Sequence, residues 1–441
     1  MEIPEGARTI IDVLARRGKE AYLVGGCVRD ALLGRRPSDY DITTSATPQE
    51  VLSCFPRTIA TGLKHGTVTV LMGKESYEVT TFRIDGKYAD NRHPLSVTFT
   101  PSLAEDLRRR DFTINAMAYS PKEGLVDLFG GRQDLKGREI RAVGLARQRF
   151  QEDALRILRA IRFSAQLGFE LEGKTEEACA LEAFRLENVS SERIRDELMK
   201  ILLSDHPEKL EEAYRLGLTR YFLPEFDSMM ATTQETPYHR LDVGHHTLEA
   251  IGHAPKDKII RLTMLFHDAG KPSTKTFDEK GIAHFYGHAF ESAKIAGKAL
   301  RRLKFPNAVV QEVFFLVLHH GDVVVPTEKA VRRAIAKIGK ERFPAFLTIQ
   351  EADILSQSDM ARVDHLARLS AVEKLWEAEK DKAECFGLKD LAVDGNDLIA
   401  CGVEKGPEIG KILNNMLKYV IDNPDKNKKG YLLNHLSSFS R

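Results

Sequence analysis

The chain has 441 residues, of which 42% are hydrophobic and 29% are charged, as is normal for a globular protein. This length exceeds what one ordinary hydrophobic core can organise, so we expect two to four domains. Lys and Arg number 65 against 64 for Asp and Glu. The overall charge therefore does not indicate a nucleic-acid partner, and such a partner can be inferred only from local clusters of basic residues.

The cysteines show no paired spacing, which argues against a disulfide framework or a zinc ribbon and favours a reducing compartment. The first residues, MEIPEGARTI, lack the basic start and apolar core of a signal peptide. The strongest apolar run, VFFLVL at residues 313–318, is too short to span a bilayer. We therefore expect a cytoplasmic protein without a membrane partner.

Residues 1–140 alternate between helix-like and strand-like patterns, which is typical of an α+β domain. The apolar run at 21–24 predicts a buried strand, and the following CVRDALLG predicts a helix that ends at Gly34. Alternating apolar residues predict strands at 67–72 and 77–82, which GKES joins as a hairpin turn.

The remainder of the chain has helical spacing almost throughout. Residues 153–167 predict a helix that ends at Gly168, and Ser191 is expected to cap the helix ERIRDELMKILL. A third region, up to about residue 353, is rich in His and Asp. We expect four parts, namely an α+β part at 1–140 and helical parts at 141–237, 238–360 and 361–441.

The stretch LVGGCVRDALLGRRPSDYDI, residues 23–42, combines glycines with an Arg-Asp pair. Gly25 and Gly26 lie between a predicted strand and a predicted helix, where backbone amides can approach a phosphate closely. Arg29 can pair with phosphate oxygens, and Asp30 can orient it. The alternative is a simple tight turn.

The same stretch carries two aspartates one residue apart, Asp39 and Asp41. If SDYDI enters a strand, the period of two places both carboxylates on one face. Two hard oxygen ligands suit Mg²⁺, which favours carboxylates together with substrate phosphates. The alternative is a turn in which the aspartates cap backbone groups.

Further motifs follow in order along the chain. They are RRDFTINAM at 109–117, DLFGG at 127–131, EDALRILRAIRF at 152–163 and ERIRDEL at 192–198. Together with GGCVRDALLG and PSDYDI, this series resembles the class II tRNA nucleotidyltransferase and bacterial poly(A) polymerase family of the DNA polymerase beta superfamily. The resemblance covers roughly the first 200 residues. It implies an α+β, DNA polymerase beta-like nucleotidyltransferase head at 1–140 and an all-helical remainder. This remainder would comprise a neck and RNA-binding region at 141–237, a body with a metal-binding region at 238–360, and a tail at 361–441.

The resemblance also implies roles for individual residues. Asp39 and Asp41 would bind the catalytic metals, with Glu78 as a third carboxylate on a neighbouring strand. The alternative for Glu78 is a solvent-facing strand residue. The motif RRDFTINAM would hold the sugar and phosphates of the incoming nucleotide through Arg110, Asp111 and Asn115.

The motif EDALR at 152–156 suggests how a protein could select cytosine and adenine. Both bases present an amino donor beside a ring-nitrogen acceptor, whereas uracil and guanine present the reverse. On a helix Asp153 and Arg156 share a face, so a carboxylate that accepts hydrogen bonds lies beside a guanidinium that donates them. The alternative is a local ion pair between the two side chains, which would contribute little. The resemblance implies a base-reading set of Glu152, Asp153 and Arg156, supported by Arg159 and Arg162.

Two further segments are expected to serve the same reaction. FRIDGKYADNRHP, residues 82–94, resembles the family's flexible loop that changes C addition to A addition, with Gly86 as a hinge. The alternative is an exposed hairpin extension. The cations Arg193, Arg195 and Lys200 are expected either to hold the acceptor end of tRNA through its phosphates or to form a solvated face.

The third region contains HHTLEAI, LFHDAGKP, FYGHAFESA, LHHG and EAD between residues 245 and 353. This series resembles the HD phosphohydrolase superfamily, an all-helical fold that binds Mn²⁺, Ni²⁺, Fe²⁺ or Mg²⁺. The alternative is a tRNA-binding scaffold that retains these residues. The resemblance implies first-metal ligands His246, His267, Asp268 and Asp353, and second-metal ligands His288 and His320, with His319 as an alternative to His320.

The leading hypothesis is therefore a template-independent enzyme that adds CCA to the 3′ end of tRNA from CTP and ATP, using Mg²⁺. One alternative is an enzyme that adds A alone, to tRNA or as poly(A). Others are a metal phosphohydrolase with an RNA-binding N-terminal half, and a non-enzymatic RNA-binding protein. The sequence does not indicate the oligomeric state.

Overall fold

The computed structural model describes residues 2–86, 97–236, 240–380 and 386–440. The chain divides into two compact units, Met1–Pro224 and Glu225–Arg441. No helix within the described ranges combines the length and hydropathy needed to cross a bilayer. The finer division into head, neck, metal-binding region and tail stays a prediction.

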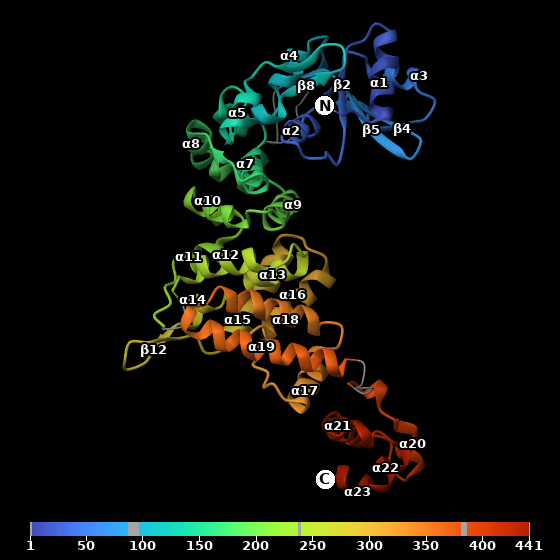
Figure 1. The fold of residues 1–441 in the computed structure, drawn as a ribbon, viewed down its shortest axis with the longest axis vertical. Coiled ribbons are helices and arrows are strands. Elements are labelled where there is room, and N and C mark those ends of the chain that lie inside the picture. The colour runs from blue at the N-terminus through green and yellow to red at the C-terminus, as the bar shows by residue number, and fades with distance from the viewer. Residues whose placement is uncertain (1, 87–96, 237–239, 381–385, 441) are drawn as a thin grey trace. The chain divides into compact units, whose positions relative to one another are not determined.

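Within its described residues, the first unit contains a seven-stranded sheet in the order β3-β4-β5-β2-β1-β8-β9 (Figure 1). Its strands pair antiparallel except β2 and β5, which are parallel. The strands are β1 (Ala21–Val24), β2 (Asp41–Thr44), β3 (Thr58–Gly62), β4 (Thr67–Met72), β5 (Glu75–Thr81), β8 (Met117–Ser120) and β9 (Gly124–Asp127). The expected α+β head is confirmed.

The hairpin β4–β5 is tighter than predicted. Met72 pairs with Glu75, so the turn consists of two residues, and Gly73 adopts the positive φ that such a turn requires. The strand expected at 77–82 therefore begins earlier and ends one residue sooner. A separate ribbon, β6 (Arg83–Asp85) with β7 (Val97–Phe99), flanks the predicted loop at 82–94, of which 87–94 lie outside the described residues.

The helices of the first unit lie around the sheet and continue beyond it. The predicted helix at 153–167 begins only at Leu155 and ends at Gly168, which adopts φ +68°. Ser190 rather than Ser191 is the N-cap of α9, and a two-stranded pair, β10 (Glu139–Ile140) with β11 (Glu170–Leu171), interrupts the predicted helical neck. The helices are α1 (Glu5–Arg16), α2 (Gly26–Leu32), α3 (Pro48–Cys54), α4 (Leu103–Arg108), α5 (Gly131–Gly137), α6 (Ala146–Glu152), α7 (Leu155–Leu167), α8 (Gly173–Leu181), α9 (Ser191–Leu202) and α10 (Leu210–Arg215).

The second unit is built mainly of helices (Figure 1). Two of these helices, α12 and α13, begin at acidic N-caps, because the side chains of Asp242 and Asp257 accept hydrogen bonds from their backbone amides. The helix α11 (Pro224–Met230) begins at the last residue of the first unit. The helices after it are α12 (Val243–His253), α13 (Lys258–Phe266), α14 (Lys271–Thr274), α15 (His288–Arg302), α16 (Asn307–His319), α17 (Glu328–Ile338), α18 (Phe343–Leu355), α19 (Asp359–Glu379), α20 (Gly395–Ala400), α21 (Pro407–Asp422), α22 (Lys429–Asn434) and α23 (Leu436–Phe439).

Separate clusters of buried side chains hold this unit together. One joins α17, α18 and α19 around Phe343, Phe346 and Trp376, and another joins α20 to α23 around Met416 and Leu432. The region is not all-helical as predicted, because β12 (Thr276–Phe277) pairs with β13 (Ala283–His284). The Asp278 carboxylate accepts backbone hydrogen bonds inside the connecting turn, which favours this hairpin.

Candidate functional site

The predicted phosphate-binding turn connects β1 to α2. Gly25 is the N-cap of α2 and has a φ of +80°, a conformation that residues with a Cβ atom disfavour. A Cβ atom at Gly25 would lie 3.5 Å from Nη1 of Arg110, a predicted nucleotide-binding residue. The fold thus places the turn beside a cation that lies far from it in the sequence.

The predicted catalytic carboxylates lie where β2 begins. Because Ile42 of β2 pairs with Val79 of β5 in parallel register, the preceding residues Asp41 and Glu78 are neighbours on adjacent strands. Desolvation and the negative charges of Glu78 and Asp39 raise the pKa of Asp41. These mutually repelling hard oxygen donors fit a divalent cation.

One expectation about this group is wrong. Asp39 does not share a strand face with Asp41, because β2 begins only at Asp41 and Asp39 lies in the preceding segment. There its carboxylate accepts a hydrogen bond from Ser38 Oγ at 3.0 Å.

Asp106 on α4, which the sequence motifs did not single out, organises two neighbouring arginines. Its carboxylate is fully buried and forms ion pairs with Arg109 at 2.8 Å and with Arg110 at 3.2 Å. Thr43 Oγ1, on β2, donates to the same carboxylate at 3.0 Å. Although burial raises the pKa of Asp106, Arg110 and Arg109 outweigh it, and the pKa is lowered. Asp106 thereby holds Arg110 against the sheet.

A hydrogen-bonded chain connects α2 with the RRDFTINAM segment and α7. Arg29 Nε donates to Asp30 Oδ1, and Arg29 Nη1 donates to Asn115 Oδ1, both at 2.8 Å. Asn115 Nδ2 then donates to Asp111 Oδ1 at 3.2 Å, and Arg159 Nε donates to Asp111 Oδ2 at 2.8 Å. Predicted nucleotide-binding residues from three sequence motifs therefore form one network.

The ring of Phe163 supports this network from α7. The guanidinium groups of Arg162, Arg29 and Arg159 lie 4.0, 5.1 and 5.4 Å from the ring centroid. Arg162 also forms an ion pair with Glu197 of α9 at 3.1 Å. Burial and the charge of Arg159 lower the pKa of Arg162 to about 10. Phe163 and Glu197 were not predicted as site residues, because an aromatic and an acid within a helix resemble ordinary packing.

Contrary to the prediction, Asp153 and Arg156 do not share a helix face. Asp153 is extended and precedes α7, where its carboxylate accepts a hydrogen bond from the backbone N–H of Leu155. The two residues also do not form the local ion pair that was the alternative. Instead Asp153 pairs with Arg193, and Arg156 pairs with Glu152, both at 2.8 Å. Each predicted base-reading group thus has its own oppositely charged partner.

The predicted RNA-binding cations of the neck all contact carboxylates. Arg193 pairs with Asp153, Arg195 with Asp196 at 2.9 Å, and Lys200 with Glu197 at 3.4 Å. Their contribution to RNA binding stays a prediction.

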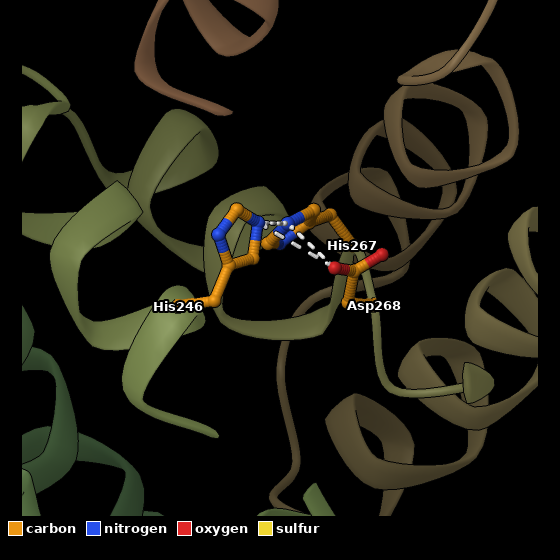
Figure 2. A group of neighbouring side chains, drawn as sticks. All are labelled: His246, His267 and Asp268. Atoms are coloured by element: carbon orange, nitrogen blue, oxygen red, sulfur yellow. Dashed lines mark hydrogen bonds and ion pairs between the residues drawn. The ribbon is translucent and has the colours of Figure 1, made fainter. Parts of the chain in front are cut away.

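The predicted HD-type residues converge from separate helices of the second unit. Figure 2 shows the imidazoles of His246 and His267 facing each other beside the Asp268 carboxylate. These residues are His246 on α12, His267 and Asp268 directly after α13, His288 at the start of α15, His320 directly after α16, and Asp353 on α18.

A glycine permits this convergence. A Cβ atom at Gly270 would lie 2.5 Å from the carbonyl oxygen of His288, so only glycine allows the segment after Asp268 to lie directly against α15. The His288 Nε2 atom consequently lies 3.5 Å from Asp268 Oδ1.

Contacts at Nδ1 orient each imidazole, so that Nε2 faces the shared centre. Such contacts fix the orientation of histidines that bind metals. The Nδ1 atoms lie within hydrogen-bond distance of backbone carbonyls for His267 (Met264, 2.7 Å), His288 (Phe285, 2.8 Å) and His320 (Val317, 2.7 Å), and of Ser356 Oγ for His246 (3.0 Å).

Asp268 is shared by two groups of potential metal ligands among the described residues. Its Oδ2 atom lies 3.3 Å from His267 Nε2 and 3.6 Å from His246 Nε2. Its Oδ1 atom lies 3.5 Å from His288 Nε2 and 3.8 Å from His320 Nε2. Asp353 lies beside the first group, with Oδ1 2.9 Å from His246 Nε2 and 3.6 Å from His267 Nε2. Asp268 can therefore bridge two adjacent sites.

The electrostatics of the cluster reflect its buried charges. Although burial lowers the pKa of His267, the carboxylates of Asp268 and Asp353 raise it to about 10. Burial and the charge of His267 lower the pKa of His320 to about 4. Lys271 Nζ lies 2.7 Å from Asp268 Oδ2. Imidazoles combined with the buried carboxylate of Asp268 and the partly buried carboxylate of Asp353 form a donor set that fits a divalent transition metal.

The structure separates the two neighbouring histidines of LHHG. The Nδ1 atom of His319 lies 2.8 Å from Asp322 Oδ2, and its ring packs on Phe315 with centroids 4.6 Å apart. His320 is therefore the histidine that the fold brings into the cluster.

Comparisons with known proteins identify the family. The model of the poly(A) polymerase head domain matches residues 21–141, that of the RNA- and SrmB-binding site of polymerase A matches 168–230, and that of tRNA nucleotidyltransferase domain 2 matches 278–436. The CCA-adding enzyme of Lactobacillus delbrueckii subsp. bulgaricus is 35% identical over 439 residues, which cover 99% of this chain and 98% of the relative. The chain belongs to the CCA-adding enzyme family.

Further members of the CCA-adding family agree with this assignment. The enzyme of Oceanobacillus iheyensis is 52% identical over 203 residues, which cover 46% of this chain and 51% of that relative. The crystal structure of the Bacillus stearothermophilus CCA-adding enzyme in complex with CTP is 32% identical and has a TM-score of 0.76, covering 99% of this chain and 98% of that one. Membership of this nucleotidyltransferase family implies dependence on a divalent metal.

Proposed function

We propose that this chain adds CCA to the 3′ end of tRNA from CTP and ATP. The observation that carries the proposal is the similarity to CCA-adding enzymes over almost the whole chain. The 3′-hydroxyl of tRNA attacks the α-phosphorus of the nucleotide, a phosphodiester bond forms, and the bond to the leaving pyrophosphate breaks. The scattered free thiols of Cys27, Cys54, Cys179 and Cys401 support a cytoplasmic location.

Asp39, Asp41 and Glu78 would hold Mg²⁺ in the head, because hard oxygen donors are the ligands that this ion prefers. When bound, Mg²⁺ favours deprotonation of the attacking hydroxyl and stabilises charge on the pyrophosphate. The adjacency of Asp41 and Glu78 on β2 and β5, and the effect of Asp39 on the pKa of Asp41, support this ligand set.

The triphosphate would lie against the turn at Gly25 and the cations beside it. Arg110, held by Asp106, and Arg29, held by Asp30 and Asn115, supply charge-assisted hydrogen bonds to phosphate oxygens. Because these arginines are already oriented, binding costs less side-chain entropy.

Base selection would fall to Asp153 and Arg156. A carboxylate accepts the amino hydrogen of cytosine or adenine, and a guanidinium donates to the ring nitrogen, whereas uracil and guanine would face like groups. Glu152 and Arg193 hold the two readers through separate ion pairs, so the readers need not neutralise each other. Leaving such groups unpaired with a wrong base can cost ~10⁴-fold in discrimination.

We also propose that the HD-type region is a metal-dependent phosphohydrolase. The convergence of histidine Nε2 atoms on Asp268 and Asp353 supports this second function. The donor set suits Mn²⁺, Ni²⁺, Fe²⁺ or Mg²⁺. Such a metal, when bound, makes water a nucleophile near neutral pH.

The nucleotidyltransferase proposal is tested with tRNA that lacks CCA and with labelled CTP and ATP, supplied separately and together. We expect CTP incorporation alone, and ATP incorporation only after CTP. Label from ATP without prior CTP incorporation would favour the A-adding alternative. Asp39→Ala should abolish addition, while Asp12→Ala, an exposed aspartate on α1, should not. Full activity of Asp39→Ala would overturn the metal assignment.

The phosphohydrolase proposal is tested by the metal content of the purified chain and by phosphoester hydrolysis. We expect His267→Ala to lose bound transition metal and hydrolysis but to retain CCA addition. His253→Ala, an exposed histidine at the end of α12, is the matched control. Hydrolysis that survives in His267→Ala would place the activity elsewhere.

A further inference from the structure

A cavity of about 290 Å³ adjoins the histidine cluster. One side carries proposed metal ligands, and the other side includes polar side chains of α19, a helix outside the HD-type motifs. The residues that matter are Asp268, His288, His320 and Asp353 on the first side, and His365 and Arg368 on the second.

The position of Arg368 follows from the packing of α19. Leu369, Val372 and Trp376 of this helix are buried in the core shared with α17 and α18. His365 and Arg368 are three residues apart and therefore share a face, which lines the cavity beside this buried stripe. The charged side chain of Arg368 therefore lines the same cavity as the proposed metal ligands.

Arg368 differs from other cations near it. Lys271, which also lines the cavity, pairs with Asp268, and Arg362 of α19 pairs with Asp359. Within the part of the chain that the structure describes, no carboxylate forms an ion pair with Arg368. An arginine that lines a cavity and has no acidic partner among the described residues is suited to bind an anion.

A hydrogen-bonded chain joins α19 to the ligand side of the cavity. The Nδ1 atom of His365 lies 2.9 Å from Gln357 Oε1, and Gln357 Nε2 donates to Asp353 Oδ2 at 3.2 Å. The position of the α19 wall relative to the metal ligand Asp353 is therefore defined by direct contacts.

We propose that Arg368 binds the non-bridging oxygens of a phosphate group whose phosphorus faces the histidine cluster, with His365 and Gln357 as positioning residues. This inference rests on the proposed phosphohydrolase function. A guanidinium presents parallel N–H groups that match two oxygens of a phosphate. The cavity thus joins a phosphate-binding wall on α19 to a metal-binding wall on the other helices.

The first test measures binding of inorganic phosphate to the full chain after removal of metals with a chelator, by isothermal titration calorimetry. We expect Arg368→Gln to weaken phosphate binding about 10- to 100-fold, the range for a charge-assisted hydrogen-bond pair. Arg362→Gln removes an arginine from the same helix away from the cavity and should leave binding unchanged. Equal affinity of wild type and Arg368→Gln would overturn the inference.

The second test loads the chain with Mn²⁺ and measures hydrolysis of p-nitrophenyl phosphate. We expect Arg368→Gln to raise KM by a similar factor while Mn²⁺ affinity and CCA addition stay at wild-type values, which shows that the variant is folded. If Arg368→Gln binds metal and hydrolyses the phosphoester with an unchanged KM, the role of Arg368 is refuted but the phosphohydrolase proposal is not. A wild-type chain that binds no metal and hydrolyses no phosphoester would refute the phosphohydrolase proposal itself and, with it, this inference.

Discussion

Replacement of Asp106 by Asn removes a buried negative charge that two arginines of the head share. The amide has one acceptor oxygen, and its N–H₂ group would face a guanidinium that can only donate. Removing one partner of a buried ion pair costs roughly 3–5 kcal/mol when the other partner stays buried. The side chains of Arg109 and Arg110 are 18% and 19% exposed and can regain water, so we expect a loss of about 2–3 kcal/mol in head stability.

The functional effect should appear in KM. Without Asp106, Arg110 loses its anchor beside the turn at Gly25, and the triphosphate must order it on binding. We expect KM for both CTP and ATP to rise about tenfold, the equivalent of about 1.4 kcal/mol. The choice between the two bases should not change, because Asp153 and Arg156 have other partners.

The assay has to report on the head itself. The single tryptophan, Trp376, lies in the second unit, so tryptophan fluorescence would not follow head unfolding. Hydrogen–deuterium exchange of peptides from β2, β5 and α4 measures local stability instead, and steady-state CTP and ATP kinetics give KM.

A matched control separates stability from nucleotide binding. Asp134→Asn also removes a buried carboxylate that is paired with an arginine, Arg141, and that accepts a hydrogen bond from Thr113 rather than from a predicted nucleotide-binding residue. It should accelerate exchange in the head without raising KM. Unchanged KM values in Asp106→Asn, together with accelerated exchange, would refute the role of Asp106 in orienting Arg110 for nucleotide binding.

Four further outcomes are expected. Asp153→Ala should raise misincorporation of UTP and GTP by at least about 100-fold, measured on tRNA lacking CCA, and unchanged fidelity would contradict its role in base reading. Phe163→Leu should lower head stability by about 1–2 kcal/mol and slow both additions, read by hydrogen exchange and single-turnover kinetics. Burial raises the pKa of Asp111, but the charge of Arg159 outweighs burial, so the pKa is lowered overall. The stability that this ion pair contributes is therefore present above about pH 4 and is lost as the pH falls below that value. Asp111→Asn should flatten this part of the acid stability profile, and an unaltered profile would count against the pair. Chelation of metal should destabilise the region around His267, and added Mn²⁺ should restore its thermal unfolding temperature in wild type but not in His267→Ala.

Local patterns in the sequence predicted much of the head. The strand at 21–24 and the stop at Gly168 follow from nearest-neighbour properties, namely an apolar run and a glycine that tolerates a positive φ. The same reasoning failed for Asp39 and Asp153, because periodicity says which residues share a face only after the ends of the element are known. Both residues lie just outside the element that was assumed to contain them.

The sequence alone determined the family, the chemical types of the site residues and the alternation of strands and helices, because motifs and periodicity are local properties of the chain. Only the tertiary structure decided which charges meet. It paired Asp153 with Arg193 instead of Arg156, placed Arg110 beside the turn at Gly25, and brought His320 rather than His319 into the histidine cluster. Such contacts join residues far apart in the chain, so they depend on how the helices and strands pack, and partial burial strengthens the interactions between charges.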